Sequence, residues 1–130
     1  MNPLGFLELK VVALAASDLP RAENFYHNTL GLAPAMEGLR AVGFKLGNLV
    51  IMLKATSDDW PARPSAELNP RLTVAVSDAP YAEKALRALG VIVSDPVLAY
   101  PDEGYCVGAF LDSEGNKLWF CSLLPDANPA

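Results

Sequence analysis

Few side chains in this sequence have the chemistry that catalysis or metal binding requires. The chain has one histidine, His27, and two cysteines. A serine or cysteine nucleophile needs a base placed beside it, but His27 follows Phe25-Tyr26 with charged neighbours at helical spacing, which predicts a surface position. The adjacent acids Asp58-Asp59 lie in a proline-rich stretch and are expected to be solvated loop residues. The sequence therefore predicts no catalytic residue.

The cysteines and the start of the chain predict a cytoplasmic protein. Cys106 and Cys121 lack the CxxC spacing of a redox or zinc motif and lie in apolar runs, so they are expected to be reduced and buried. The first residues lack the basic start and apolar core of a secretion signal. No apolar run approaches the ~20 residues of a membrane span, which predicts no membrane association.

Length, composition and charge limit the classes of function. The chain has 130 residues, of which 52% are hydrophobic and 19% charged, and this predicts one folded domain with a substantial core. The formal net charge of −5 argues against nucleic acid as a partner, because phosphate binding needs clustered Lys and Arg. An acidic surface is compatible with cationic ligands, or it serves only to keep the protein soluble.

The strongest pattern is an internal repeat. Residues 17–23 read Ser-Asp-Leu-Pro-Arg-Ala-Glu and residues 77–83 read Ser-Asp-Ala-Pro-Tyr-Ala-Glu, so five of the seven positions are identical at an offset of 60 residues. Each copy follows a strand-like run and leads into a helical pattern that ends at a glycine, Gly31 or Gly90. Such a repeat predicts two fused copies of one strand–helix unit.

Period-two and helical patterns predict the elements of each half. In the first half they are a strand over 7–16, a helix from Ser17 or Asp18 to Gly31, a turn-prone stretch over 33–38, and strands over 41–46 and 49–53. In the second half they are a strand over 71–76, a helix over 79–89, a short strand over 91–94, a loop over 95–104, and strands over 105–111 and 117–123. Residues 54–70 fit neither pattern and are predicted to connect the halves.

Two motifs resemble the glyoxalase/bleomycin-resistance/dioxygenase superfamily, also called vicinal oxygen chelate proteins. The first is Ser-Asp-Leu-Pro-Arg-Ala-Glu-Asn-Phe-Tyr at 17–26, followed by Leu-Gly-Leu at 30–32. The second is Phe-Leu-Asp-Ser-Glu-Gly-Asn at 110–116, with Ser113 where the family usually has proline. The resemblance implies an α+β fold. Two tandem βαβββ modules, at about 7–53 and 71–123, would form a curled mixed sheet around a central cavity, with the helices outside. It also implies a homodimer.

The resemblance places the family's metal ligands at positions that cannot serve as ligands here. Enzymes of the family hold a divalent metal through His, Gln or Glu side chains from both modules. In this sequence those positions fall on Val11, on Ile51 or Met52, on Arg71 and on Trp119. None of these side chains suits a divalent cation, and Arg71 would repel it. We therefore expect no metal and no other cofactor, and this argues against an enzyme.

The same positions predict a largely apolar cavity. Arg71 would either bind an acidic group of the ligand or reach solvent at the rim, and Trp119 would either stack on the ligand or fill the core. Trp60 would act as a lid, contact a dimer partner or pack on its own subunit. The predicted lining residues are Leu9, Val11, Ala13, Met52, Thr73, Ala75, Tyr105, Val107 and Trp119. The predicted ligand-binding residues are Val11, Ala13, Met52, Trp60, Arg71, Thr73, Tyr105 and Trp119.

Three functions are compatible with these residues. The first is a metal-free protein that binds a largely apolar or aromatic small molecule in the cavity or in a groove at the dimer interface, similar to the bleomycin-resistance branch. The second is a metal-dependent lyase, isomerase or dioxygenase of the glyoxalase type that recruits non-standard ligands such as Glu8, Glu37 or Glu103. The third is a module that acts only through contacts with protein partners.

Overall fold

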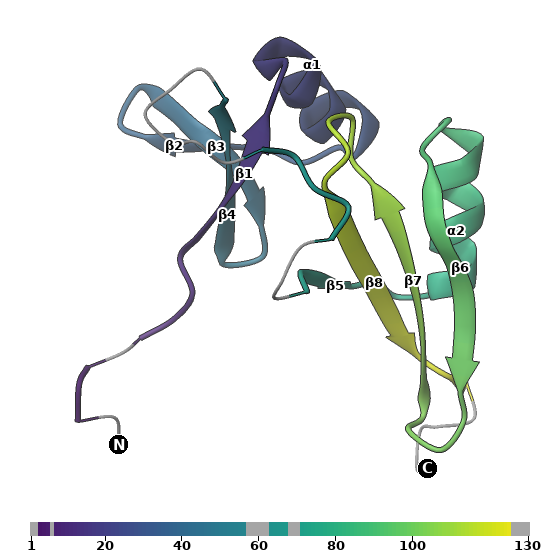
Figure 1. Ribbon diagram of the computed structural model, residues 1–130. Helices are drawn as coiled ribbons and strands as arrows, with labels where there is room; N and C mark the ends of the chain where they lie inside the picture. The colour runs from purple at the N-terminus through teal and green to yellow at the C-terminus, as the bar shows by residue number, and fades with distance from the viewer. Residues whose placement is uncertain (1–2, 6, 57–62, 68–70, 126–130) are drawn as a thin grey trace. The chain divides into compact units, whose positions relative to one another are not determined.

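The chain folds into two compact units, Met1–Arg63 and Pro64–Ala130. The computed structural model describes residues 3–5, 7–56, 63–67 and 71–125. Each unit is a four-stranded mixed sheet with a helical segment (Figure 1). Within the described ranges, no helix is long and apolar enough to span a membrane.

The first unit contains four strands and one helical segment. In chain order its elements are β1 (Val11–Ala16), α1 (Leu19–Asn24), η1 (Phe25–Thr29), β2 (Pro34–Glu37), β3 (Arg40–Leu46) and β4 (Leu49–Ala55). The strand order is β1-β4-β3-β2, with β1 parallel to β4 and the other pairs antiparallel. The helical segment continues from α1 into η1. This last turn is π-helical, because the Leu30 amide donates to the Phe25 carbonyl five residues back, at 2.9 Å.

The second unit repeats this arrangement. Its elements are β5 (Thr73–Ala75), α2 (Ala79–Ala88), β6 (Val93–Tyr100), β7 (Tyr105–Leu111) and β8 (Lys117–Leu123). The strand order is β5-β8-β7-β6, with β5 parallel to β8. Both units therefore have the βαβββ order and the same strand pairing. This confirms the predicted α+β class and the two tandem modules.

Identical N-terminal caps explain why the repeated motif starts a helix in each unit. The Asp18 carboxylate accepts a hydrogen bond from the Arg21 amide at 3.1 Å, and Asp78 accepts one from the Tyr81 amide at 3.1 Å. The glycine that follows each helix has a positive φ, which matches its predicted role in ending the helix.

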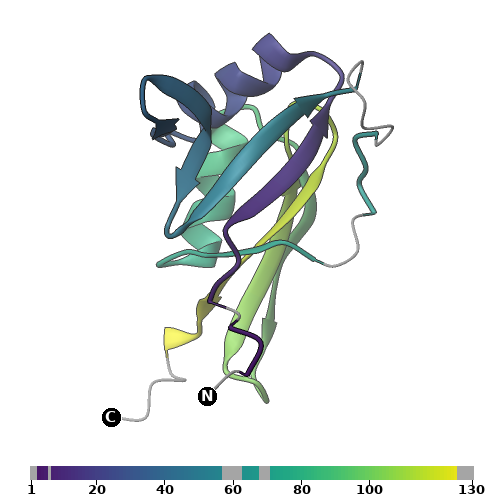
Figure 2. The ribbon, with the colours of Figure 1, turned by 90° about the vertical axis from the view of Figure 1, so that its left-hand side faces the viewer.

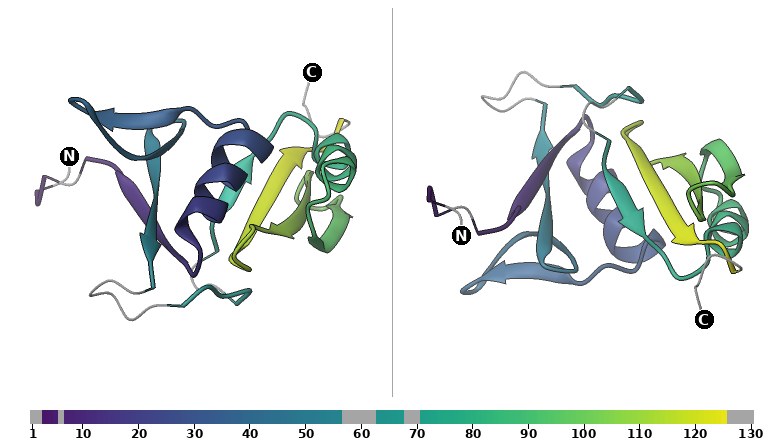
Figure 3. Two further views of the ribbon diagram at one scale, coloured as in Figure 1. Left: turned by 90° about the horizontal axis from the view of Figure 1, so that it is seen from above. Right: turned by 90° about the horizontal axis from the view of Figure 1, so that it is seen from below.

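In each unit the helix covers one face of its own sheet. In the first unit, α1 and η1 lie along β1 and β4 (Figure 2), and the fully buried Tyr26 stacks on Phe44 with ring centroids 6.2 Å apart. In the second unit, α2 contacts β6, β7 and β8 (Figure 3). The opposite face of each sheet carries no helix of its own unit, and we call it the helix-free face.

Three predicted element bounds are wrong. The first strand begins at Val11 rather than Leu7. The stretch predicted as a turn contains β2, and the stretch predicted as a loop lies largely in the long strand β6. Both β2 and β6 are edge strands with irregular register. Edge positions tolerate bulges and proline, so Pro96 lies within β6 although proline usually breaks a strand.

The Glu83 carboxylate joins α2 to the irregular part of β6. One carboxylate oxygen accepts from the Val97 amide at 2.7 Å and the other from Arg87 Nε at 2.9 Å. The hydrogen bond from the Val97 amide is the main cause that lowers the pKa of Glu83 below its usual value. A carboxylate with a lowered pKa stabilises the fold at neutral pH, and this stabilisation is lost as the pH falls through the folded-state pKa.

We expect Glu83→Gln to lower the free energy of unfolding by about 1 kcal/mol at pH 7, because the amide keeps an acceptor but loses the charge. The difference between wild type and variant should shrink as the pH falls from the unfolded-state pKa of about 4.3 through the lower folded-state pKa, because Glu83 is protonated first in the unfolded and then in the folded state. Urea unfolding at pH 7 and at pH 3.5 measures both effects. Glu37→Gln, an exposed position on β2, serves as the control and should change neither value.

Candidate functional site

The helix-free face of the second sheet brings together most of the site residues predicted for this half. Residues paired across neighbouring strands point to the same face. Thr73 pairs with Trp119 and Tyr105 pairs with Leu123, which lies four residues after Trp119 on the same strand. Arg71 precedes Thr73 by two positions and lies on the same side. Arg71, Thr73, Tyr105 and Trp119 therefore share one surface.

Two cations lie over the indole ring of Trp119. The guanidinium carbon of Arg71 is 3.9 Å from the ring centroid, and Lys117 Nζ is 4.5 Å from it. Trp119 is half-buried and Arg71 is exposed. Attraction between a cation and the ring face contributes about 0.5–1 kcal/mol at an exposed site. Arg71 is thus exposed and at the same time stacked on Trp119.

An ion pair holds one of these two cations in place. Lys117 Nζ lies 2.7 Å from an Asp95 carboxylate oxygen. The hydrogen bond from Lys117 is the largest cause that lowers the pKa of Asp95, and the charge of Arg71 acts in the same direction. In the described part of the chain Arg71 itself forms no ion pair. The charged groups near the Trp119 ring are Arg71, Lys117 and Asp95, so their net charge is positive although the protein as a whole is acidic.

The rest of this face is apolar and aromatic. The rings of Tyr100 and Tyr105 pack with centroids 5.9 Å apart. A hydrogen bond to the Glu103 carboxylate is the main cause that raises the pKa of Tyr105. Leu98 and Leu123 are also strongly exposed. The face therefore combines a cation-covered indole with an apolar surface, a combination suited to a ligand with both an aromatic body and an acidic group.

In the first unit the predicted residues share the helix-free face of their sheet. Ala13 pairs with Met52, and Val11 lies two residues before Ala13 on the same strand. Ile51 pairs with Val12 on the opposite face and is buried. Met52, not Ile51, is therefore the residue of β4 that shares a face with Val11. Whether the helix-free faces of the two sheets line one cavity stays a prediction, and Trp60 lies outside the described residues.

The residues that the resemblance places at the family's metal positions do not suit a metal ion. Val11, Met52, Arg71 and Trp119 offer no carboxylate, imidazole or thiolate. Among the residues that the structure describes, no group of three or more His, Cys, Asp or Glu side chains could hold a metal. We therefore derive no reaction step that uses a metal.

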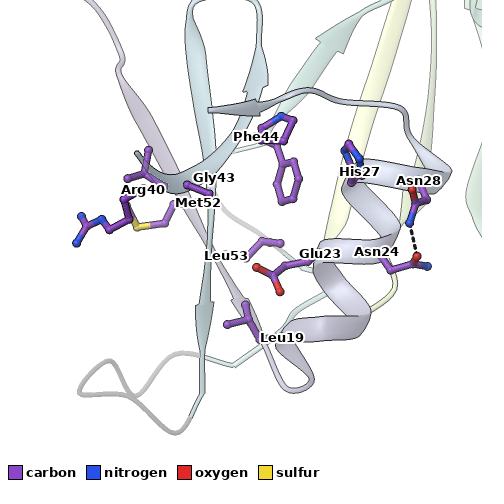
Figure 4. A pocket seen from close by; sticks show the side chains of 13 residues that line it. Leu19, Glu23, Asn24, His27, Asn28, Arg40, Gly43, Phe44, Met52 and Leu53 are labelled. Atoms are coloured by element: carbon purple, nitrogen blue, oxygen red, sulfur yellow. Dashed lines mark hydrogen bonds between the residues drawn. The ribbon is translucent and has the colours of Figure 1, made fainter. Parts of the chain in front are cut away.

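A groove beside the helix of the first unit was not predicted, although its lining includes the predicted ligand-binding residue Met52. It has a volume of about 580 Å³ and lies between α1–η1 and the strands β3 and β4. Figure 4 shows Glu23, His27, Phe44 and Leu53 around it. His27 is exposed, as predicted. The available signal was the four-residue spacing of Glu23 and His27, which places both on one helix face.

The chain belongs to the Glyoxalase/Bleomycin resistance protein/Dioxygenase superfamily, whose sequence profile matches residues 8–120. Comparison with curated protein sequences gives no significant match.

Several solved structures have a similar fold. A superfamily member from Sphaerobacter thermophilus has 21% identity and a TM-score of 0.74, covering 90% of this chain and 98% of that chain. TnmS3, an antibiotic-binding protein from Streptomyces sp. CB03234, has 18% identity and a TM-score of 0.70, with 92% and 98% covered. A lactoylglutathione lyase from Agrobacterium tumefaciens has 22% identity and a TM-score of 0.65, with 91% and 95% covered. At these identities the likeness shows the fold alone.

Proposed function

We propose that this protein binds a small, largely apolar or aromatic molecule without a metal ion, and that the helix-free face of the second sheet is part of the binding site. The observation that carries the proposal is the Arg71 guanidinium over the Trp119 indole, 3.9 Å from the ring centroid. These two residues stand where enzymes of the family would carry metal ligands. TnmS3 supports the proposal as a protein of the same fold that binds an antibiotic.

The proposed ligand is planar and carries an acidic group. Arg71 is exposed and forms no ion pair within the described residues, so it can move from the indole to a ligand carboxylate. The ligand ring then takes its place on Trp119. Lys117 is held by Asp95 and stays in position, where its charge also attracts the anion. The complex thereby replaces a cation–ring contact by ring stacking and a charged hydrogen bond.

A fluorescence titration tests the proposal. The chain has two tryptophans, so Trp60→Phe leaves Trp119 as the single reporter. We expect saturable quenching by 2-naphthoate and weaker binding of 2-naphthylmethanol, which lacks the charge. Arg71→Gln should weaken naphthoate binding about tenfold and change naphthylmethanol binding by less than about twofold. EDTA should change neither titration.

Two results would count against the proposal, one from this titration and one from metal analysis. No quenching by any compound of a broad aromatic panel that includes bleomycin would overturn it. Stoichiometric Zn, Ni, Mn or Fe in protein purified without chelator, with binding abolished by EDTA, would support the metal-dependent alternative instead.

We also propose that two copies of the chain form a homodimer in the cytoplasm and complete the site between them. The exposed side chains of Leu98, Tyr100 and Leu123 support this, because apolar side chains gathered on one surface favour a partner. Light scattering on the titrated samples measures the mass. A monomer at all concentrations, with and without ligand, would contradict the dimer but not the binding site.

A further inference from the structure

We propose that the groove between α1–η1 and strands β3 and β4 is a second binding site, and that it takes a small organic cation with an apolar or aromatic body. The volume of about 580 Å³ is within the range of small-molecule sites. Every residue that lines it belongs to the first unit. The groove therefore does not depend on the second sheet or on the site around Trp119.

The groove has an apolar floor on the side of the sheet and a wall formed by the helix. On the helix, Leu19, Glu23 and His27 recur every four residues and so lie on one face. Phe44 and Leu53 project from the sheet toward that face (Figure 4). The His27 ring lies beside the Phe44 ring, with centroids 6.3 Å apart and planes tilted by 30°. The apolar body of a ligand would rest on Phe44 and Leu53.

The charge directed into the groove is negative. The Glu23 carboxylate points toward Leu53 and the space below Phe44 (Figure 4). Arg40 also lines the groove, but its guanidinium points away from Leu53 and Phe44. Among the described residues, neither Glu23 nor Arg40 forms an ion pair. A cation placed beside Glu23 would gain a carboxylate partner, and the neighbouring face of the Phe44 ring would add to the attraction.

In its neutral form the histidine adds an acceptor to the same wall. His27 Nδ1 lies 3.1 Å from the Leu32 carbonyl oxygen. A carbonyl can only accept, so Nδ1 carries the proton, and in the neutral ring Nε2 is an acceptor. Glu23 and His27 thus provide a carboxylate and a nitrogen lone pair along the same wall. This set favours an ammonium group over an anion.

The test follows amide shifts of the full chain by NMR during titration with benzylammonium. We expect saturable shifts in α1, η1 and β3, and no saturable shifts with phenylacetate, which has a similar body and the opposite charge. Glu23→Gln should weaken benzylammonium binding about fivefold, because it removes the charge and keeps the side-chain shape. Glu37→Gln, an exposed position that does not line the groove, is the matched control and should bind as wild type.

The results that overturn the groove proposal are distinct from those that concern Trp119. Equal affinity of Glu23→Gln and wild type, equal binding of phenylacetate, or shifts confined to β7 and β8 would each overturn it. Circular dichroism melts of both glutamine variants check that folding is unchanged. Since the fluorescence titration uses Trp119 and an anionic probe, either proposal can fail while the other stands.

Discussion

Replacement of Trp119 by leucine should weaken binding of 2-naphthoate by at least about thirtyfold. The indole provides the stacking surface, and a buried tryptophan contact of this kind contributes about 2 kcal/mol or more. Leucine keeps an apolar side chain on the half-buried surface but has no ring for the ligand or for Arg71 to stack on. Isothermal titration calorimetry measures the affinity, because the variant lacks the reporter tryptophan.

Two further variants separate a binding role from a packing role for Trp119. Trp119→Phe keeps a smaller ring and should recover part of the lost affinity. Tyr81→Leu removes an exposed aromatic ring from α2, on the opposite side of the sheet, and should bind as wild type. If Trp119→Leu binds naphthoate normally while its melting temperature falls by several degrees, Trp119 fills the core and does not contact the ligand.

Local sequence was enough to predict the repeated unit, because its signals act within a few residues. Each Asp carboxylate caps its helix by accepting a hydrogen bond from the backbone amide three residues further along. A glycine after each helix adopts the required positive φ. Strand β2 and most of β6, beyond the predicted short strand over 91–94, were not predicted because pairing partners define them. Pro96 makes β6 resemble a loop in the sequence. In the structure two register shifts interrupt its pairing, but β7 supplies a partner along most of its length.

For the candidate site, the sequence predicted which face each residue occupies but not what it touches. The resemblance to the family implied that Thr73 and Trp119 line one surface, and the strand register places both on the same face of the second sheet. The position of Arg71 over Trp119 depends on side-chain conformations across two strands, which no local pattern encodes. The groove was missed for a similar reason. The spacing of Glu23 and His27 defines a helix face, but not the distance from that face to the sheet.

The Asn116 side chain ties the turn before β8 to the connector between the halves. It is almost fully buried. Its amide nitrogen donates to Asp112 at 3.1 Å, and its carbonyl oxygen accepts from the Ser65 amide at 3.1 Å. The Lys117 amide in turn donates to the Ser65 carbonyl at 3.0 Å. This explains in physical terms why the Asp-Ser-Glu-Gly-Asn motif ends in asparagine: its side-chain amide can donate to one partner and accept from another.

Asn116→Ala should lower the free energy of unfolding by about 3 kcal/mol, because it removes one buried and one part-buried hydrogen bond and leaves the Ser65 amide and an Asp112 oxygen without these partners. For a chain of this size the melting temperature should fall by roughly 10 °C. Asn48→Ala, at an exposed hairpin turn, is the matched control and should shift it by less than about 2 °C. Asn116→Asp keeps the acceptor for Ser65 but places a second negative charge beside Asp112. At pH 7 it should therefore lower the free energy of unfolding by at least as much as Asn116→Ala does. If Asn116→Asp melts like wild type at pH 7, the donor of the Asn116 amide contributes nothing to stability, and the connector must be held by other contacts.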